Sequence, residues 1–167
     1  AQNLIKCARL VVSDYKGIFP KDEHSLLKLP GIGTYTSAAI QSIGFNIKAT
    51  VIDGNVARII CRINALTSTI TKSQKQIKSH ASRLIPPKRF GDYAQALMDL
   101  GSQICTPRKP KCINCPINRY CKAYALGLAN QIPHPKPRKV KPNKYGYAFV
   151  TFTNDNNIIL ERRPDDG

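Results

Sequence analysis

The stretch Cys105–Cys121, CTPRKPKCINCPINRYC, decides how the rest of this 167-residue sequence is interpreted. It holds four of the six cysteines, with the spacing Cys-x6-Cys-x2-Cys-x5-Cys. Disulfide frameworks are typical of small secreted chains, whereas this sequence contains no apolar segment of the secretory type and has enough apolar residues for a core. Four thiols this close together therefore indicate a metal site, either tetrahedral zinc or an iron–sulfur cluster.

The spacing of the cysteines separates these two kinds of site. Structural zinc is usually held by two Cys-x2-Cys pairs that a long stretch separates, and this stretch has a single such pair with unequal flanks. It resembles instead the iron–sulfur loop of the endonuclease III superfamily of DNA glycosylases. That resemblance implies a [4Fe–4S] cluster with four ligands: Cys105, Cys112, Cys115 and Cys121.

The cysteine stretch is also strongly basic. Residues 105–122 contain five Lys or Arg residues and no acidic one. One or two positive charges could simply balance the thiolates, but five favour a surface presented to phosphates. We expect three of them to bind DNA: Arg108, Lys109 and Lys111.

The composition of the whole chain agrees with a polyanionic partner. It has 26 Lys and Arg against 10 Asp and Glu, a formal charge of +16, while a solubilised surface needs a net charge of only about 2 to 8. The basic residues are not concentrated on one amphipathic helix, so nucleic acid is favoured over an anionic membrane. No apolar run approaches the length that spans a membrane.

The 104 residues before the cysteine stretch show helical spacing of their apolar side chains, with short loops between the helices. Thr71 with Gln74 resembles a capping box, and the pair Pro86-Pro87 ends the helix that it opens. The predicted fold class is all-α. The expected helices cover residues 3–14, 22–28, 34–44, 53–63, 71–84 and 90–104.

A two-glycine turn, LPGIGTYTSA at residues 29–38, joins two of these helices. Glycine lets backbone N–H groups approach a ligand without a Cβ in the way, and N–H groups at a helix start favour an anion. An ordinary interhelical turn is the alternative. The stretch resembles the helix-hairpin-helix of the same superfamily, which holds a DNA phosphate through backbone amides. The residues that the resemblance assigns to this contact are Pro30, Gly31, Gly33 and Thr34.

The sequence VIDGNVAR supplies an aspartate, Asp53, where the superfamily has its catalytic one. Asp53 is also well suited to cap the helix that follows, and the two roles are compatible. By resemblance, its carboxylate stabilises the positive oxocarbenium character at C1′ when a glycosidic bond breaks. Asn55 matches a supporting polar residue beside it, or belongs simply to the helix start.

Tyr35 narrows the resemblance within the superfamily. Endonuclease III-like enzymes carry a lysine there that attacks C1′ and forms a Schiff base, which a phenol cannot do. Together with VIDGNVAR and FGDYAQALMDLGSQICTPRKPKC, this residue resembles the MutY-type adenine DNA glycosylases. These remove adenine mispaired with 8-oxoguanine or guanine after flipping it from the double helix. Gln95 matches a position that contacts the flipped adenine, although it could be an ordinary exposed helix residue.

The composition changes after the cysteines, where prolines alternate with basic residues from Gln131 onward. YGYAFVTF and IILERR, joined by TNDNN, predict a β-hairpin. It resembles the start of the Nudix-like domain that reads 8-oxoguanine in that family. The expected division is therefore a six-helix-barrel part with the helix-hairpin-helix at 1–48, an iron–sulfur part at 49–125, a basic linker at 126–144 and the start of the Nudix-like domain at 145–167.

One element of the family pattern has no match. The catalytic glutamate that protonates adenine lies on an early helix in that family, and this sequence has only Glu23, expected in a loop, and Glu161 on the last strand. We therefore expect an internal fragment of a longer enzyme that acts as a monomer on double-stranded DNA, in the bacterial cytoplasm or in a eukaryotic nucleus or mitochondrion. The alternatives are an endonuclease III-like glycosylase for another base and a non-catalytic helix-hairpin-helix module with a structural metal.

Overall fold

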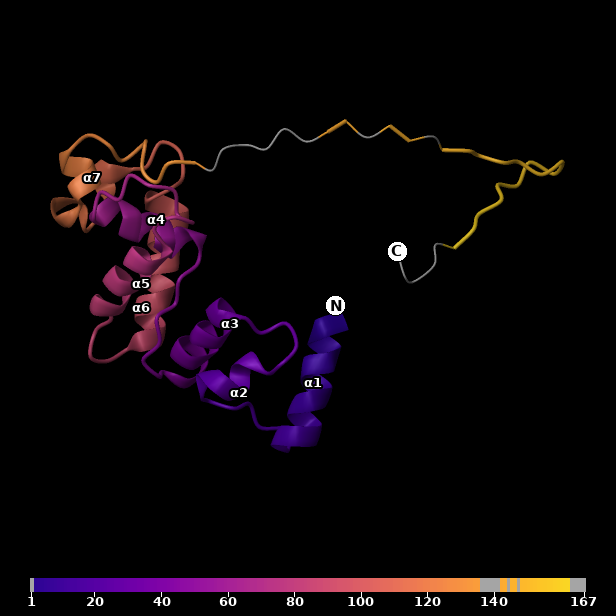
Figure 1. The fold of residues 1–167 in the computed structure, drawn as a ribbon, viewed down its shortest axis with the longest axis horizontal. Helices are drawn as coiled ribbons and strands as arrows, with labels where there is room; N and C mark the ends of the chain where they lie inside the picture. The colour runs from indigo at the N-terminus through magenta and orange to yellow at the C-terminus, as the bar shows by residue number, and fades with distance from the viewer. Residues whose placement is uncertain (1, 136–141, 144, 147, 163–167) are drawn as a thin grey trace. The chain divides into compact units, whose positions relative to one another are not determined.

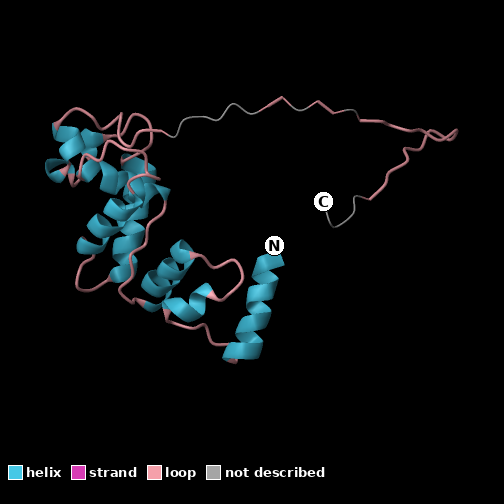
Figure 2. Ribbon diagram, in the orientation of Figure 1, coloured by secondary structure: helices cyan, strands magenta, loops and turns pink. Residues whose placement is uncertain are grey.

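A computed structural model describes residues 2–135, 142–143, 145–146 and 148–162. The chain divides into two compact units, residues 1–136 and 137–167, which are considered separately. Within the described residues, the first unit consists of helices and loops (Figure 2). This confirms the all-α fold class predicted from the apolar spacing.

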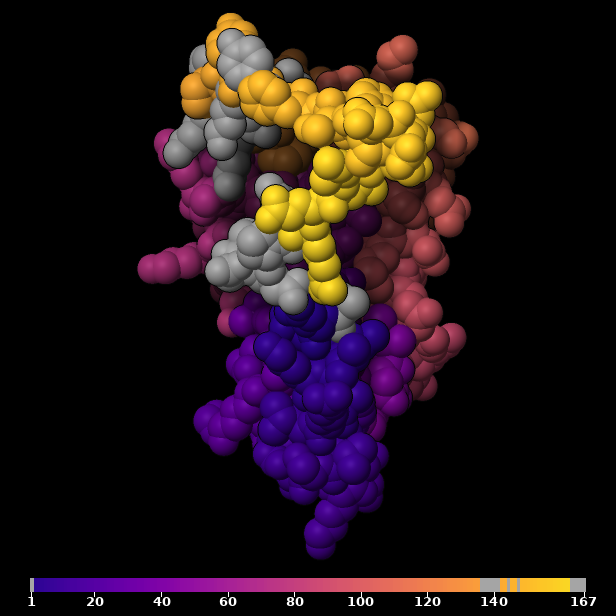
Figure 3. Space-filling model, turned by 90° about the vertical axis from the view of Figure 1, so that its right-hand side faces the viewer, coloured from indigo at the N-terminus to yellow at the C-terminus, as the bar shows by residue number. Residues whose placement is uncertain are grey.

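Three helices form the beginning of the first unit, and they lie close together (Figure 1). Their core consists of Cys7, Val11, Leu26 and Leu29. Helix α1 also carries apolar side chains on its outer side, where Leu4 and Val12 are exposed, and Figure 3 shows this indigo segment at the surface. The elements are α1 (Gln2–Tyr15), α2 (Glu23–Leu27) and α3 (Thr34–Ala39), which continues as the π-helical turn η1 (Ile40–Gly44).

The second group of helices surrounds α4, the most deeply buried element (Figure 1). Val56, Ile60 and Cys61 of α4 pack with Ile77 of α5. Seven of the ten residues of α4 are buried, because helices cover it on several sides. The elements are α4 (Gly54–Ile63), α5 (Gln74–Arg83), α6 (Phe90–Asp99), the π-helical turn η2 (Leu100–Ile104), the 3-10 turns η3 (Cys112–Asn114) and η4 (Asn118–Tyr120), and α7 (Lys122–Ala125).

A close approach of backbones joins the two groups of helices. Helix α6 packs against η1, and a Cβ added at Gly91 would lie 2.8 Å from the carbonyl oxygen of Ser42. Only a glycine fits at that distance. The position of the glycine turn relative to α4 therefore depends on this contact.

The helix boundaries agree with the sequence prediction except at two places. The capping box at Thr71 and Gln74 is wrong, since Ser73 precedes α5 and no side chain caps that helix. Glu23 lies in the first turn of α2 and not in a loop. The predicted helices 34–44 and 90–104 are continuous, but each ends in a π-helical turn.

The linker does not begin at residue 126, where the sequence prediction placed its boundary. Ala129 and Ile132 are buried in the first unit, and the carbonyl oxygen of Ile132 accepts a hydrogen bond from Arg62 Nε at 2.8 Å. Residues 126–135 therefore pack against the helices instead of leaving them. All five Lys and Arg residues of the expected linker lie outside the described residues: Lys136, Arg138, Lys139, Lys141 and Lys144.

The second unit shows a turn where the hairpin is expected. Phe152 and Ile158 form an isolated antiparallel bridge, and the backbone N–H of Thr153 donates to the carbonyl of Asn157. No longer strand forms in the described part of this unit, so the two-stranded hairpin is not observed. Among the described residues of the whole chain, no helix is both long and apolar enough to cross a membrane.

Candidate iron–sulfur and catalytic sites

The four cysteines of the basic loop lie around one cavity. Cys105 follows η2, Cys112 begins η3, Cys115 follows η3 and Cys121 precedes α7. The cavity encloses about 290 Å³ of space, counting the part open to solvent, and all four cysteines line it together with Arg62 and Tyr124. A group held in this cavity would therefore meet all four thiols.

The surroundings of the cavity affect its thiols. Burial, followed by the negative charges of Cys105 and Cys121, raises the pKa of the Cys112 thiol above its ordinary value. Burial is also the main cause that raises the pKa of the Cys115 thiol. Four cysteine thiolates are the usual ligand set of an iron–sulfur cluster, and all four line this cavity.

Arg62, on the buried side of α4, holds the first part of the cysteine loop. Its side chain is 2% exposed. Nη1 lies 3.2 Å from Cys105 Sγ and donates to the carbonyl oxygen of Thr106 at 2.7 Å. Nη2 donates to the carbonyl of Pro107 at 3.2 Å. A guanidinium has five N–H donors in a fixed plane, so one side chain can satisfy this irregular backbone and a ligand sulfur together.

The basic residues of the loop point outward from this support. Arg108, Lys109 and Lys111 are all exposed. The hydroxyl of Thr106 donates to the carbonyl of Arg108, and the backbone N–H of Lys109 donates to Asn130 Oδ1 at 3.1 Å. The backbone is thus fixed while the charged ends remain free to meet phosphates.

The glycine turn leads directly into α3. Gly31 has φ +83°, a conformation that other residues adopt at a cost. Gly33 precedes α3, and no side chain caps that helix. Because the first N–H groups of a helix have no partner within it, the backbone amides of Thr34 and Tyr35 have no partner within α3. Contact of this turn with a phosphate stays a prediction.

Asp53 is a helix cap, as its sequence context indicated. Its Oδ1 accepts a hydrogen bond from the backbone N–H of Val56 at 2.7 Å. Its Oδ2 accepts one from Asn55 Nδ2 at 3.1 Å. A cap on one oxygen and an amide on the other fix the plane of the carboxylate.

Two neighbours hold Asn55 in turn. Arg58 Nη2 donates to Asn55 Oδ1 at 2.8 Å and to the carbonyl oxygen of Gly101 at 2.7 Å. A Cβ at Gly101 would lie 2.5 Å from the Cβ of Asn55, which is too close for any side chain. Arg58 Nε also donates to the carbonyl of Cys105 at 2.7 Å. The start of α4 and the cysteine loop therefore share one hydrogen-bond network.

The sequence analysis missed both arginines. They are one helical turn apart in α4, which is otherwise mostly apolar, and this spacing was the available signal. Burial lowers the pKa of Arg58 from its ordinary value, while the thiolate of Cys105 and, more weakly, the Asp53 carboxylate oppose that shift.

Of the remaining predicted residues, two line a second hollow and one does not. Tyr35 is 42% exposed, and its hydroxyl donates to Met98 Sδ at 3.7 Å. Thr34 and Tyr35 line a hollow that Glu23 also lines. Gln95 is exposed on α6 and donates to the carbonyl of Gly91. Neither Gln95 nor Asp53 is among the residues that line this hollow.

Comparison with known proteins bears on the cysteine loop and on the chain as a whole. Residues 105–121 match the family described as the iron–sulfur binding domain of endonuclease III. An adenine DNA glycosylase of Buchnera aphidicola is 34% identical over 167 residues, which is 100% of this chain and 48% of that protein. The human adenine DNA glycosylase is 42% identical over 119 residues, 70% of this chain and 22% of that protein. The chain thus spans less than half the length of these relatives.

A solved structure shares the fold. A thermostable thymine-DNA glycosylase superposes with a TM-score of 0.67 at 34% sequence identity, over 75% of this chain and 58% of that one. The helix-hairpin-helix glycosylase fold that the resemblance implied is therefore confirmed. The cofactor expectation is confirmed too, because the matched domain binds an iron–sulfur cluster and contains all four cysteines.

Proposed function

This chain is a relative of the DNA glycosylases that carry the endonuclease III iron–sulfur domain, and from that relationship we propose that its protein excises adenine from DNA. The substrate is adenine mispaired with 8-oxoguanine or guanine in a duplex. The reaction is hydrolysis of the N-glycosidic bond without strand cleavage. The observation that carries this proposal is the doubly held Asp53 carboxylate, combined with a tyrosine at position 35.

The proposed role of Asp53 follows from its fixed position. When the bond between adenine and C1′ breaks, positive charge develops on the sugar. A carboxylate that is already oriented stabilises that charge without reorganising during the reaction. The side-chain amide of Asn55 donates to Asp53 Oδ2 and orients it, and Arg58 donates to Asn55 Oδ1 and orients Asn55.

Tyr35 decides between hydrolysis and strand cleavage. Cleavage by the superfamily's lyases needs an amine that forms a Schiff base with C1′. Tyr35 has a phenol, whose hydroxyl donates to Met98 Sδ. Because a phenol cannot form a Schiff base, water is the nucleophile that remains. Gln95, at the surface of α6, is proposed to contact the flipped base.

Two surfaces are proposed to bind the DNA backbone. Gly31, Gly33 and their neighbours present backbone amides, and the cysteine loop presents Arg108, Lys109 and Lys111. Phosphate contacts fix the register of the protein on the duplex and carry no sequence information. The cluster, held by the four cysteines, supplies the covalent links that give the loop its shape.

The nearest rival is a glycosylase that removes another base. The similar solved structure is a thymine-DNA glycosylase at 34% identity, so enzymes with this helical fold do not all remove the same base. The tyrosine and the adenine-specific relatives favour adenine. A non-catalytic binding module would not need the network around Asp53.

A cleavage assay on the natural full-length protein tests the proposal. End-labelled duplexes carry one adenine opposite 8-oxoguanine or one thymine opposite guanine, and they are analysed with and without hot alkali. The proposal expects strand breaks at the adenine only after alkali. Direct breakage would contradict the role of Tyr35, breakage at thymine would favour the rival base, and intact strands in every lane would favour a binding module.

A further inference from the structure

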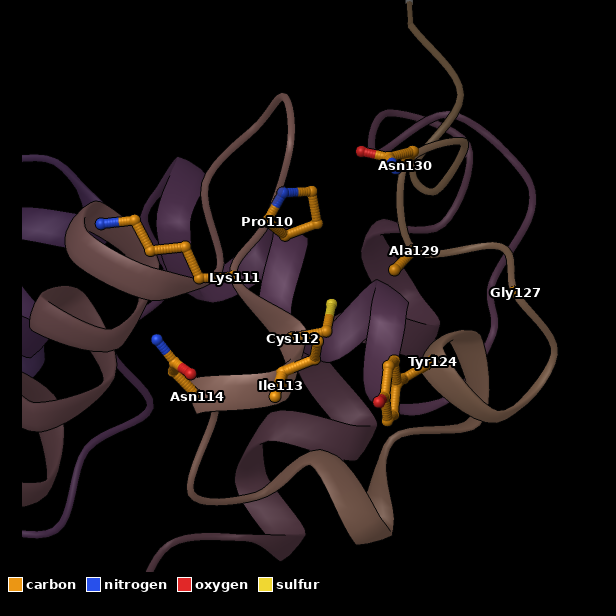
Figure 4. Close-up of a pocket in the computed structure, with 9 residues that line it drawn as sticks. All are labelled: Pro110, Lys111, Cys112, Ile113, Asn114, Tyr124, Gly127, Ala129 and Asn130. Atoms are coloured by element: carbon orange, nitrogen blue, oxygen red, sulfur yellow. The ribbon is translucent and has the colours of Figure 1, made fainter.

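A broad hollow adjoins the cysteine cavity on its outer side. It encloses about 900 Å³, counting its open side, and nine residues line it: Pro110, Lys111, Cys112, Ile113, Asn114, Tyr124, Gly127, Ala129 and Asn130 (Figure 4). Four of these residues also line the cavity that the four cysteines share: Pro110, Cys112, Tyr124 and Ala129. These four therefore form the boundary between solvent and the cluster site.

Cys112 differs from the other three cysteines at this boundary. All four line the inner cavity, but Cys112 alone among them also lines the outer hollow. In Figure 4 its sulfur points into the space between Pro110, Tyr124 and Ala129. Cys105, in contrast, has its sulfur beside the buried guanidinium of Arg62 at 3.2 Å.

Tyr124 is the largest side chain at the boundary. It lies on α7, is 40% exposed, and lines both the hollow and the cavity. The other shared residues besides Cys112 are a proline and an alanine, which offer little surface. The hydrophobic shell around a metal site controls the access of solvent to it, and here that shell depends mainly on one ring.

We propose that this hollow is the access route to the iron–sulfur cluster, that Cys112 is the ligand reached first from solvent, and that the ring of Tyr124 restricts the route. The proposal concerns the wall of the cluster site in this chain and does not depend on which base the protein removes. It implies that small reagents attack the cluster at the iron that Cys112 holds.

The first test follows the rate at which the cluster loses iron. The cluster-loaded full-length protein is mixed with a coloured iron(II) chelator, bathophenanthroline disulfonate, and the release of iron is recorded. Tyr124→Ala should accelerate release about tenfold, within the range that changes around a metal site produce. Tyr124→Phe keeps the ring and should release iron at the wild-type rate.

The matched control is Tyr120→Ala. Tyr120 is 64% exposed, directly precedes the ligand Cys121 and does not line the hollow. Its loss should leave the rate unchanged. Equal rates for Tyr124→Ala and the wild type would overturn the proposal, and so would equal acceleration by both alanine variants, which would mean general loosening of the loop.

The second test identifies the ligand that is released first. After removal of roughly one iron per cluster, free thiols are alkylated with iodoacetamide and located by mass spectrometry of peptides. The proposal expects the label on Cys112 ahead of the other three ligands. Preferential labelling of Cys105, Cys115 or Cys121 would overturn it, as would equal labelling of all four. Buried Cys61, whose pKa burial raises to about 11, serves as the unlabelled internal reference.

Discussion

The glycine turn and the cysteine loop are proposed to bind the same DNA backbone, but they are built in different ways. The turn at residues 29–34 is shaped by its own backbone, with one glycine at positive φ and an uncapped helix start. The loop at residues 105–121 is held from outside, by Arg62, Asn130 and the cluster. A short turn between two helices can support itself. The longer loop pairs its own backbone mainly in the turns η3 and η4, and side-chain donors and a cofactor hold the rest.

This difference predicts that changes far from DNA damage the loop more than the turn. The largest effect is expected for Arg62→Leu, which leaves the carbonyls of Thr106, Pro107 and Ile132 without their donor. Each buried unsatisfied group costs about 1 to 3 kcal/mol, so the variant should lose the visible absorbance of the cluster and much of its thermal stability.

The matched control for this change is Arg119→Leu. Arg119 is exposed in the same loop and lies over the ring of Tyr120, so its removal should keep the cluster. Circular dichroism melting and the iron content of the purified proteins check both variants. A fully loaded and stable Arg62→Leu protein would show that the cluster alone orders the loop.

The next largest effect is expected where α4 meets η2. In Gly101→Ala the new Cβ would lie 2.5 Å from the Cβ of Asn55, which must move and release Asp53 Oδ2. A displacement of about 1 Å near a reacting centre can cost on the order of 100-fold in rate. We expect adenine release to fall by roughly 10- to 100-fold, and single-turnover kinetics measure it.

Gly54→Ala is the control for this comparison, because a Cβ at Gly54 meets nothing within 4 Å. It should retain the rate of the wild-type protein. If Gly101→Ala were as active as Gly54→Ala, the contact between η2 and Asn55 would have no part in positioning the aspartate.

A smaller effect is expected from the charges of the loop. Replacing Arg108, Lys109 and Lys111 one at a time by alanine should weaken DNA binding and lower the slope of log affinity against log salt by about 1 for each lost phosphate contact. Lys75, exposed on α5, provides the control. If Lys75→Ala lowered the slope equally, the net charge of the chain and not the loop would account for binding.

The smallest effects are expected in the glycine turn. Gly31→Ala should destabilise the protein by about 1 to 2 kcal/mol, because its φ of +83° disfavours a side chain. Gly33→Ala meets open space and an ordinary φ, so its stability should change by less than about 0.5 kcal/mol.

DNA binding separates the two roles of these glycines. If a phosphate approaches the backbone at Gly33, then Gly33→Ala should weaken binding although the protein remains stable. Chemical denaturation and fluorescence anisotropy measure the two quantities. Unchanged binding in Gly33→Ala would leave the turn as an ordinary connection between helices.

The sequence was most informative where function depends on local chemistry. The cysteine spacing predicted the iron–sulfur domain, and the residues after Asp53 predicted its cap, because both patterns act within a few residues. Arg58 and Arg62 could not be assigned in this way. An arginine on a helix is usually exposed, and only the fold reveals carbonyl acceptors 40 or more positions away.

The same limit explains the linker. The sequence prediction placed it from residue 126, but burial of Ile132 and its bond to Arg62, a contact distant in sequence, hold residues 126–135 on the helices. Glu23 is a different case. The helix predicted at residues 22–28 already included it, and the local cap of that helix, from the Ser25 N–H to Asp22, is consistent with that helix and not with a loop.

The most direct test of the central claim is Asp53→Asn in the full-length protein, assayed on a duplex with adenine opposite 8-oxoguanine. Asparagine caps a helix about as well as aspartate, so the fold, the cluster content and DNA affinity should persist while adenine release falls by several orders of magnitude. That separation is the result this account predicts. Adenine release at the wild-type rate by a stable, DNA-binding variant would contradict it and would leave Asp53 as a helix cap alone.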